Sequence, residues 1–211
     1  MSAPHTPAAG PATFEFTADN LALAQRIIAK YPEGRQTSAV MPLLDLAQRQ
    51  NDNWLPQVAM DYIAGMLGMA PIRVYEVASF YTMYNLKPVG KHFVQVCTTT
   101  PCWLRGSDEV LAACKRKLGI GPGETTPDGQ FTVVEVECQG ACVNAPVIAL
   151  DDIYYEDLDA ASTEALLDTL IRGEKPKPGP QNGRINSAPI GGPTTLIEMA
   201  RRNGVKPASQ E

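Results

Sequence analysis

The sequence predicts a chain of mixed α and β structure: a bundle of short helices, then a layer of strands and helices, then an extended tail. Apolar residues recur at helical spacing up to about residue 88, and alternating strand patterns begin near residue 91. From Gly173 onward the chain holds six prolines and six glycines, a composition that cannot build its own core. We therefore expect a flexible arm, a helical domain, an α/β domain and a Pro/Gly-rich docking tail over residues 1–16, 17–88, 89–175 and 176–211.

Size and charge exclude several classes of function. A length of 211 residues with 44% hydrophobic residues allows a sizeable core, and a net charge of −5 argues against binding to a nucleic-acid backbone. No run reaches the ~18 apolar residues of a spanning helix, and the first residues have neither a secretory nor a transit-peptide pattern. We expect a bacterial cytoplasmic protein or a mature organellar one, with no membrane span.

Four short amphipathic helices account for the first part of the chain. Periodic apolar residues predict helices over Asn20–Lys30 and Ser38–Gln50, and Pro56 and Pro71 each suit the first turn of another. The aromatic run Phe80–Tyr84 is expected to pack in the core rather than to form a docking surface.

The second part alternates strands with helices. Strands are predicted over Lys91–Val96 and Phe131–Glu137, with a helix between them that starts at Ser107. A hairpin and a last helix follow, over Val147–Leu150, Ile153–Glu156 and Thr163–Arg172. The order β-α-β-β-β-α predicts a small thioredoxin-like layer, and a ferredoxin-like split βαβ is the competing topology.

Four of the five cysteines stand in two close pairs, each directly after a predicted strand. The pairs are Cys97 with Cys102 and Cys138 with Cys142. An odd number of cysteines in a chain of this size favours metal binding over disulfides, and thiolates select zinc, copper(I) or iron–sulfur clusters. The spacing alone does not choose among these. We expect one site with four thiolate ligands.

The residues around the pairs favour an iron–sulfur cluster. Its buried negative charge needs donors, and backbone N–H groups of Thr98, Thr99, Thr100, Gly140 and Ala141 lie in suitable loops. Cys114 stands apart and is expected to be a small core residue. Neither His92 nor His5 is expected to have a carboxylate or serine partner for acid–base or nucleophilic chemistry, and no nucleotide-binding fingerprint is present.

Three motifs together resemble one family. They are Ser79–Tyr84, Cys97-Thr98-Thr99-Thr100-Pro101-Cys102 and Glu137–Pro146. They are similar to the small iron–sulfur subunit in the NADH-oxidising module of NADH:quinone oxidoreductase, respiratory complex I, in its alphaproteobacterial and mitochondrial form. The resemblance runs from about Phe14 to Pro180. Gln139 departs from the pattern, where a leucine is expected.

The resemblance implies a helical bundle followed by a thioredoxin-like ferredoxin domain with one [2Fe–2S] cluster. Cys97 and Cys102 would hold one iron, and Cys138 and Cys142 the other. The partners would be the flavoprotein subunit, which binds FMN and NADH, and the large iron–sulfur subunit. The cluster would exchange an electron with that flavin, off the main path to quinone. The enzyme is the whole proton-translocating NADH:ubiquinone reductase, whose peripheral arm lies on the cytoplasmic side of the bacterial inner membrane or the matrix side in mitochondria.

Three alternatives stay open at this stage. The chain could be the equivalent small subunit of a NAD-linked hydrogenase or formate dehydrogenase, which only its partner chains would reveal. It could be a zinc-stabilised interaction module, which would be colourless and free of acid-labile sulfide. A dithiol redox enzyme is the weakest alternative, because neither pair has the C-x-x-C spacing of such enzymes.

Overall fold

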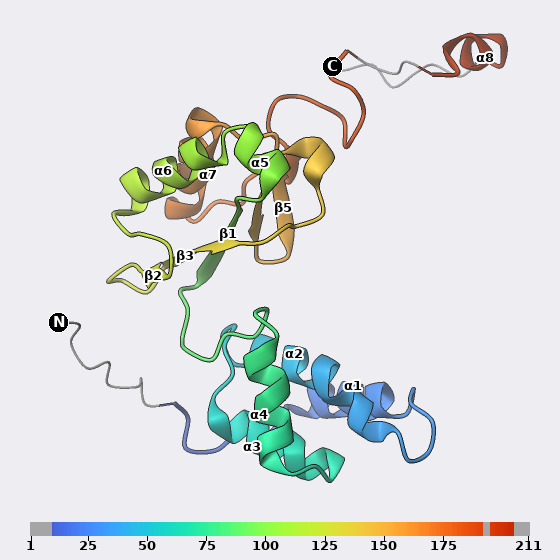
Figure 1. Ribbon diagram of the computed structural model, residues 1–211, viewed down its shortest axis with the longest axis vertical. Helices are drawn as coiled ribbons and strands as arrows, with labels where there is room; N and C mark the ends of the chain where they lie inside the picture. Colours follow the sequence, from blue (N-terminus) through green and yellow to red (C-terminus); the bar gives the residue numbers. More distant parts are fainter. Residues whose placement is uncertain (1–9, 192–194, 205–211) are drawn as a thin grey trace. The chain divides into compact units, whose positions relative to one another are not determined.

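A computed structural model of the chain describes residues 10–191 and 195–204 (Figure 1). The chain divides into two units, residues 1–89 and 90–211. In the described part of the chain, no helix is long and apolar enough to cross a membrane.

The first unit is built from the four helices that the sequence predicts and from one 3₁₀ turn that it does not predict. They are α1 (Ala18–Ile28), the 3₁₀ turn η1 (Gln36–Ala39), α2 (Val40–Gln50), α3 (Gln57–Leu67) and α4 (Pro71–Phe80). The Thr17 side chain caps α1 by accepting the backbone N–H of Asn20, and Gly68 ends α3 in a left-handed conformation. The core of the unit centres on fully buried aliphatic side chains, among them Leu43, Leu44, Ile63 and Val74.

The packed structure extends further toward the N-terminus than the expected arm allows. Phe16 is buried and Phe14 is partly buried in the helical core, and both rings meet Tyr62 edge to face. Residues 1–9 of that arm lie outside the described residues.

The expectation that Phe80–Tyr84 packs in the core is wrong for most of the run. Phe80 is 77% exposed and Met83 is 53% exposed, and the rings of Phe80 and Tyr81 meet edge to face. Only Tyr84 is buried, with its hydroxyl donating to the backbone oxygen of Met41. The apolar run continues past the end of α4, so helical spacing no longer determines which side chains face inward.

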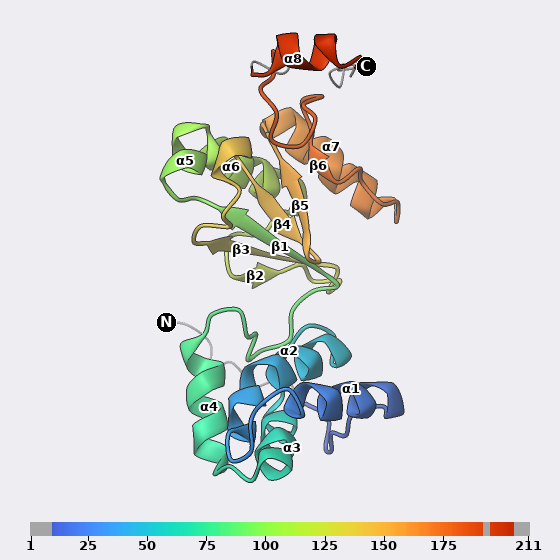
Figure 2. The same cartoon turned by 90° about the vertical axis from the view of Figure 1, so that its right-hand side faces the viewer.

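The second unit is a mixed sheet with helices (Figure 2). Its strands are β1 (His92–Cys97), β2 (Glu124–Thr125), β3 (Phe131–Val136), β4 (Ile148–Leu150), β5 (Ile153–Glu156) and β6 (Gly179–Pro180). Its helices are α5 (Thr100–Leu104), α6 (Ser107–Leu118), the 3₁₀ turn η2 (Cys142–Asn144) and α7 (Ala160–Ile171). The sheet order is β2-β3-β1-β4-β5-β6.

This topology is the predicted thioredoxin-like one. Strand β1 is parallel to β3 on one side and antiparallel to β4 on the other, and β4 continues into β5 as a hairpin. Strands β1 and β3, which the helices α5 and α6 connect, are direct neighbours, whereas in a split βαβ unit another strand would lie between them. The short strands β2 and β6 are additions at the sheet edges.

The core of the second unit lies between the sheet and the helices α6 and α7. Val94 and Val96 of β1 pack with Val110 and Cys114 of α6 and with Leu167 of α7. Just before β1, the chain passes very close to the backbone at the start of β3. A side chain at Gly90 would come within 2.6 Å of the Phe131 backbone, so this position requires glycine.

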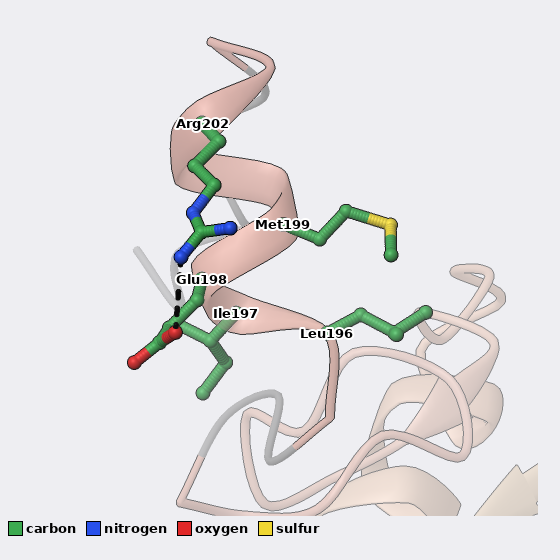
Figure 3. A pocket seen from close by; sticks show the side chains of 5 residues that line it. All are labelled: Leu196, Ile197, Glu198, Met199 and Arg202. Carbon is green, nitrogen blue, oxygen red and sulfur yellow. Dashed lines mark ion pairs between the residues drawn. The ribbon is translucent and has the colours of Figure 1, made fainter.

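The end of the tail forms a short helix, α8 (Ile197–Arg202). The sequence predicts a single turn over residues 194–200, of which Thr194 lies outside the described residues. Arg202 reaches back to Glu198 at 3.9 Å, while Leu196 and Met199 point to the other side and line a surface pocket (Figure 3). This helix is too short to bury an apolar face of its own.

Candidate metal centre

The sheet brings the two cysteine pairs to the same edge. Cys97 is the last residue of β1, and it is in register with Val136, the last residue of β3. Because β1 and β3 are parallel, their carboxyl ends meet at one edge, and Cys138 follows β3 by two residues. All five cysteines are free thiols.

The first pair is buried. Cys97 and Cys102 are each 2% exposed and pack with Ala145 and Val147. Burial opposes ionisation of Cys97, but the Thr99 hydroxyl at 3.4 Å and the backbone N–H of Gln139 outweigh it, so the pKa of Cys97 lies below its ordinary value. Burial, followed by the neighbouring Cys97, raises the pKa of Cys102 to about 12.

The second pair is exposed and held by a tight loop. The Sγ atoms of Cys138 and Cys142 are 3.5 Å apart, and the backbone N–H of Gly140 donates to Cys138 Sγ at 3.3 Å. That N–H lowers the pKa of Cys138, whereas the hydrogen bond with Cys138 raises the pKa of Cys142. Gly140 has φ +78°, which glycine adopts at little cost.

The arrangement fits a binuclear iron–sulfur group. Each pair brings two sulfur atoms together, and the pairs influence each other electrostatically, Cys102 through Cys142 and Cys138 through Cys97. Within residues 10–191 and 195–204, no three His, Cys, Asp or Glu side chains gather closely enough to hold one metal ion. Two pairs suit a group in which each of two metal ions takes two thiolates.

The sulfur atoms have donors, as the sequence predicts, although partly different ones. The backbone of Thr99 and that of Gly140 donate to sulfur, whereas the Thr98 N–H is used by the sheet and donates to Val136 O. The sequence gives no signal for two further backbone donors, Gln139 toward Cys97 and Val147 toward Cys102. Both arise because β1, β4 and the loop after β3 meet in the folded sheet.

Cys114 and His92 lie apart from the two cysteine pairs. Cys114 is fully buried inside α6, as predicted, and burial raises its pKa to about 12. His92 does have a carboxylate partner, contrary to expectation, since its Nδ1 lies 3.2 Å from Asp151 Oδ2. The two residues are 59 positions apart, and the β1–β4–β5 pairing brings them together at the end of β1 opposite Cys97.

The unexpected Gln139 contacts a tyrosine. The Tyr154 hydroxyl donates to the backbone oxygen of Gln139 at 2.7 Å and lies 3.3 Å from its side-chain oxygen. The backbone contact ties the loop that carries Cys138 and Cys142 to β5 whatever side chain stands at position 139.

Exposed apolar side chains directly follow two of the cysteines in the sequence. Trp103 and Leu104, directly after Cys102, are 56% and 70% exposed, and Val143, directly after Cys142, is 64% exposed. We call Trp103, Leu104 and Val143 the apolar rim. Large exposed apolar side chains are typical of a surface that another protein covers when they form a continuous patch.

Fold and site together define a class, the iron–sulfur proteins in which a thioredoxin-like sheet carries cysteine pairs at its edge. The family described as thioredoxin-like [2Fe–2S] ferredoxin matches residues 24–171. The chain is 54% identical over 194 residues to the NADH dehydrogenase [ubiquinone] flavoprotein 2 of Dictyostelium discoideum mitochondria, covering 92% of this chain and 76% of that protein. It is 59% identical over 157 residues to a NADH-quinone oxidoreductase subunit of Rickettsia bellii, covering 74% of this chain and 94% of that protein.

A solved structure agrees in fold. The NAD+-reducing [NiFe]-hydrogenase in its H2-reduced state aligns with a TM-score of 0.55 and 23% identity, over 64% of this chain and 23% of that chain. The chain belongs to the thioredoxin-like [2Fe–2S] ferredoxin family and, within it, to the family of these NADH-quinone oxidoreductase subunits.

Proposed function

We propose that this chain is the electron-transfer subunit of the NADH-oxidising module of respiratory complex I, and that its four paired cysteines hold the [2Fe–2S] cluster. Cys97 and Cys102 hold one iron, and Cys138 and Cys142 the other. The observation that carries the proposal is the meeting of two thiol pairs at one edge of the sheet. When bound, the cluster takes up and returns one electron.

The residues of the site make that group stable and accessible from one side. Backbone N–H groups and the Thr99 hydroxyl point at sulfur, and so they stabilise thiolate charge in a partly buried place. The walls around Cys97 and Cys102 exclude water, whereas the exposed Cys138 and Cys142 leave one side open to a partner. The chain supplies ligands and an insulating scaffold.

The apolar rim supports a proposal for the partners. We infer that the flavoprotein subunit, which binds FMN and NADH, covers Trp103, Leu104 and Val143, so that the electron passes between flavin and cluster through this face. The exchange lies off the main path to quinone. The large iron–sulfur subunit of the same module is the second partner. The complex places the chain in the peripheral arm, on the cytoplasmic side of the bacterial membrane or the matrix side in mitochondria.

The test is the metal content of anaerobically purified protein, together with its visible spectrum and its EPR spectrum after dithionite reduction. We expect two irons and two acid-labile sulfides per chain, in keeping with the family. Replacing Cys97, Cys102, Cys138 or Cys142 by alanine should abolish or destabilise the cluster, while Cys114→Ala, the matched control, should keep it. Zinc without sulfide would contradict the proposal, as would a normal cluster in all four ligand variants.

The choice between complexes needs a second measurement. Affinity purification of the tagged chain from its own organism, followed by identification of the associated chains, should recover the flavoprotein and large iron–sulfur subunits of complex I. Recovery of hydrogenase or formate dehydrogenase subunits instead would assign the chain to one of those complexes.

A further inference from the structure

The segment after α7 does not leave the folded unit but returns to the cluster edge. We call residues 179–188 the strap. It begins as β6, an edge strand parallel to β5 in which Gly179 pairs with Tyr155, and the backbone N–H of Gln181 donates to Glu156 O at 2.9 Å. Gly179 has φ +82°, the left-handed conformation that favours glycine.

Arg184 of the strap joins the ligand loop to the body of the unit. Its Nη1 donates to the backbone oxygen of Val143 at 3.0 Å, and its Nη2 lies 3.1 Å from Asp157 Oδ1. The two charged side chains are only 13% and 3% exposed, so water screens their attraction weakly. A guanidinium that bonds a carboxylate and a carbonyl at once fixes the direction of both.

A second contact holds the same turn. Asn144, buried at 3% exposure, donates from Nδ2 to Asn186 O of the strap and to Glu156 Oε2, both at 2.8 Å. Its own backbone oxygen accepts the N–H of Asp157 at 2.7 Å. The turn η2 starts at Cys142 and has no side-chain cap of its own. The strap therefore holds it through its other two residues, Val143 and Asn144.

We propose that Arg184 is a positioning residue for the Cys138–Cys142 ligand loop, and that the strap controls how firmly this loop holds the cluster. The inference rests on the proposed function, which makes Cys142 a ligand. Arg184 touches no sulfur itself. It acts through the Val143 carbonyl, one residue from the ligand, with Asp157 as its anchor. Groups that orient ligands in this way change metal affinity by roughly 10- to 100-fold when they are removed.

The experiment uses the cluster-loaded, full-length chain and three variants. Arg184→Gln removes the charge that binds Asp157, and Arg184→Lys keeps a cation. Arg116→Gln is the matched control because it breaks an exposed ion pair with Glu164, between α6 and α7, that has no contact with the strap. Three quantities are measured: the rate at which a strong iron chelator bleaches the visible absorption, the EPR g-values after dithionite reduction, and the urea unfolding of the cluster-free protein.

We expect Arg184→Gln to bleach at least about tenfold faster than wild type, with shifted g-values. Arg184→Lys should lie between Arg184→Gln and wild type in its bleaching rate and in its g-values, and Arg116→Gln should match wild type. Bleaching and g-values of Arg184→Gln equal to those of wild type would overturn the inference. The inference would also be overturned if Arg184→Gln bleached faster only in proportion to a lower unfolding free energy of the cluster-free protein, while its g-values stayed unchanged.

A second variant covers the case in which Arg184→Gln does not fold. Asp157→Asn keeps the shape of the anchor and removes its charge, and it should give the same direction of change; normal bleaching and g-values in this variant also overturn the inference. The wild-type protein separates the two proposals. If the wild-type protein holds no iron and sulfide, the proposed function and the role of Arg184 are both refuted. If the wild-type protein holds the cluster and the variants behave like wild type, only the role of Arg184 is refuted.

Discussion

Replacing Gly140 by alanine should weaken the hold on the cluster more than it weakens the fold. Gly140 has φ +78°, and a β-carbon built there meets no atom within 4 Å, so the substitution adds backbone strain but no collision. A non-glycine residue in this left-handed region costs about 1–2 kcal/mol. That energy corresponds to a factor of about 5–30 in an equilibrium.

Where the strain is felt depends on what holds the loop. In the cluster-free protein the exposed loop around Gly140 can relax at the cost of hydrogen bonds such as those of Gly140 N–H with Cys138 Sγ and of Tyr154 with Gln139 O. With metal bound to Cys138 and Cys142, the loop must keep its conformation. The strain should therefore lower cluster affinity by about 5- to 30-fold, while the cluster-free protein keeps most of its unfolding free energy.

Gly173 provides a matched control for this experiment. It has φ +76°, with equally open space around it, but it follows α7 and its N–H donates to Leu170 O. Gly173→Ala should lower the free energy of unfolding by about 1–2 kcal/mol and leave chelator bleaching of the cluster as in wild type. Urea titration and the bleaching rate measure the two effects. If Gly140→Ala bleaches no faster than Gly173→Ala, the loop conformation does not govern cluster retention and the reasoning is refuted.

Three further predictions concern the second unit. Cys114→Ser places a hydroxyl in the core and should lower the free energy of unfolding by about 1–3 kcal/mol, with the iron and sulfide content unchanged; loss of the cluster without loss of stability would contradict the core assignment. Asp159 caps α7 by accepting the Ser162 N–H, which holds its pKa below the ordinary value, so Asp159→Ala should cost about 1 kcal/mol at neutral pH. This contribution is complete above the ordinary carboxyl pKa of about 4 and disappears as the pH falls through the lower folded value, so urea titrations of wild type and variant should converge in acid. Gln139→Leu keeps the bond from Tyr154 to the backbone and should change stability by no more than about 0.5 kcal/mol, with EPR g-values as in wild type; a clear shift in g-values would show that the side chain acts on the cluster.

The sequence predicts the main elements because their signals are local. Helices α2 and α6 and the β4–β5 hairpin follow from apolar spacing, from charges at helix ends and from turn residues within a few positions of each other. The cysteine pairs are visible for the same reason, since both lie directly behind strands. That Cys97 and Cys102 are buried while Cys138 and Cys142 are exposed depends on the neighbouring strands, which spacing does not reveal.

The parts that escape prediction depend on contacts between distant residues. The two-residue strands β2 and β6 have no periodicity, and β6 lies in a Pro/Gly-rich segment whose composition indicates a tail. The side chain of Asp157 is buried against Arg184, and no local pattern in the sequence links these two distant residues. The sequence cannot show that the strap returns to the sheet, because its backbone bonds carry no side-chain signature.

The unequal burial of the two thiol pairs gives the centre an inside and an outside. Oxidants dissolved in water reach Cys138 and Cys142 first, whereas Cys97 and Cys102 are screened by packed side chains. Oxidation of the sulfur atoms therefore begins at the exposed pair, Cys138 and Cys142. A partner that covers Trp103, Leu104 and Val143, as proposed above, would close that opening, and assembly would then protect the redox group as well as connect it to other centres.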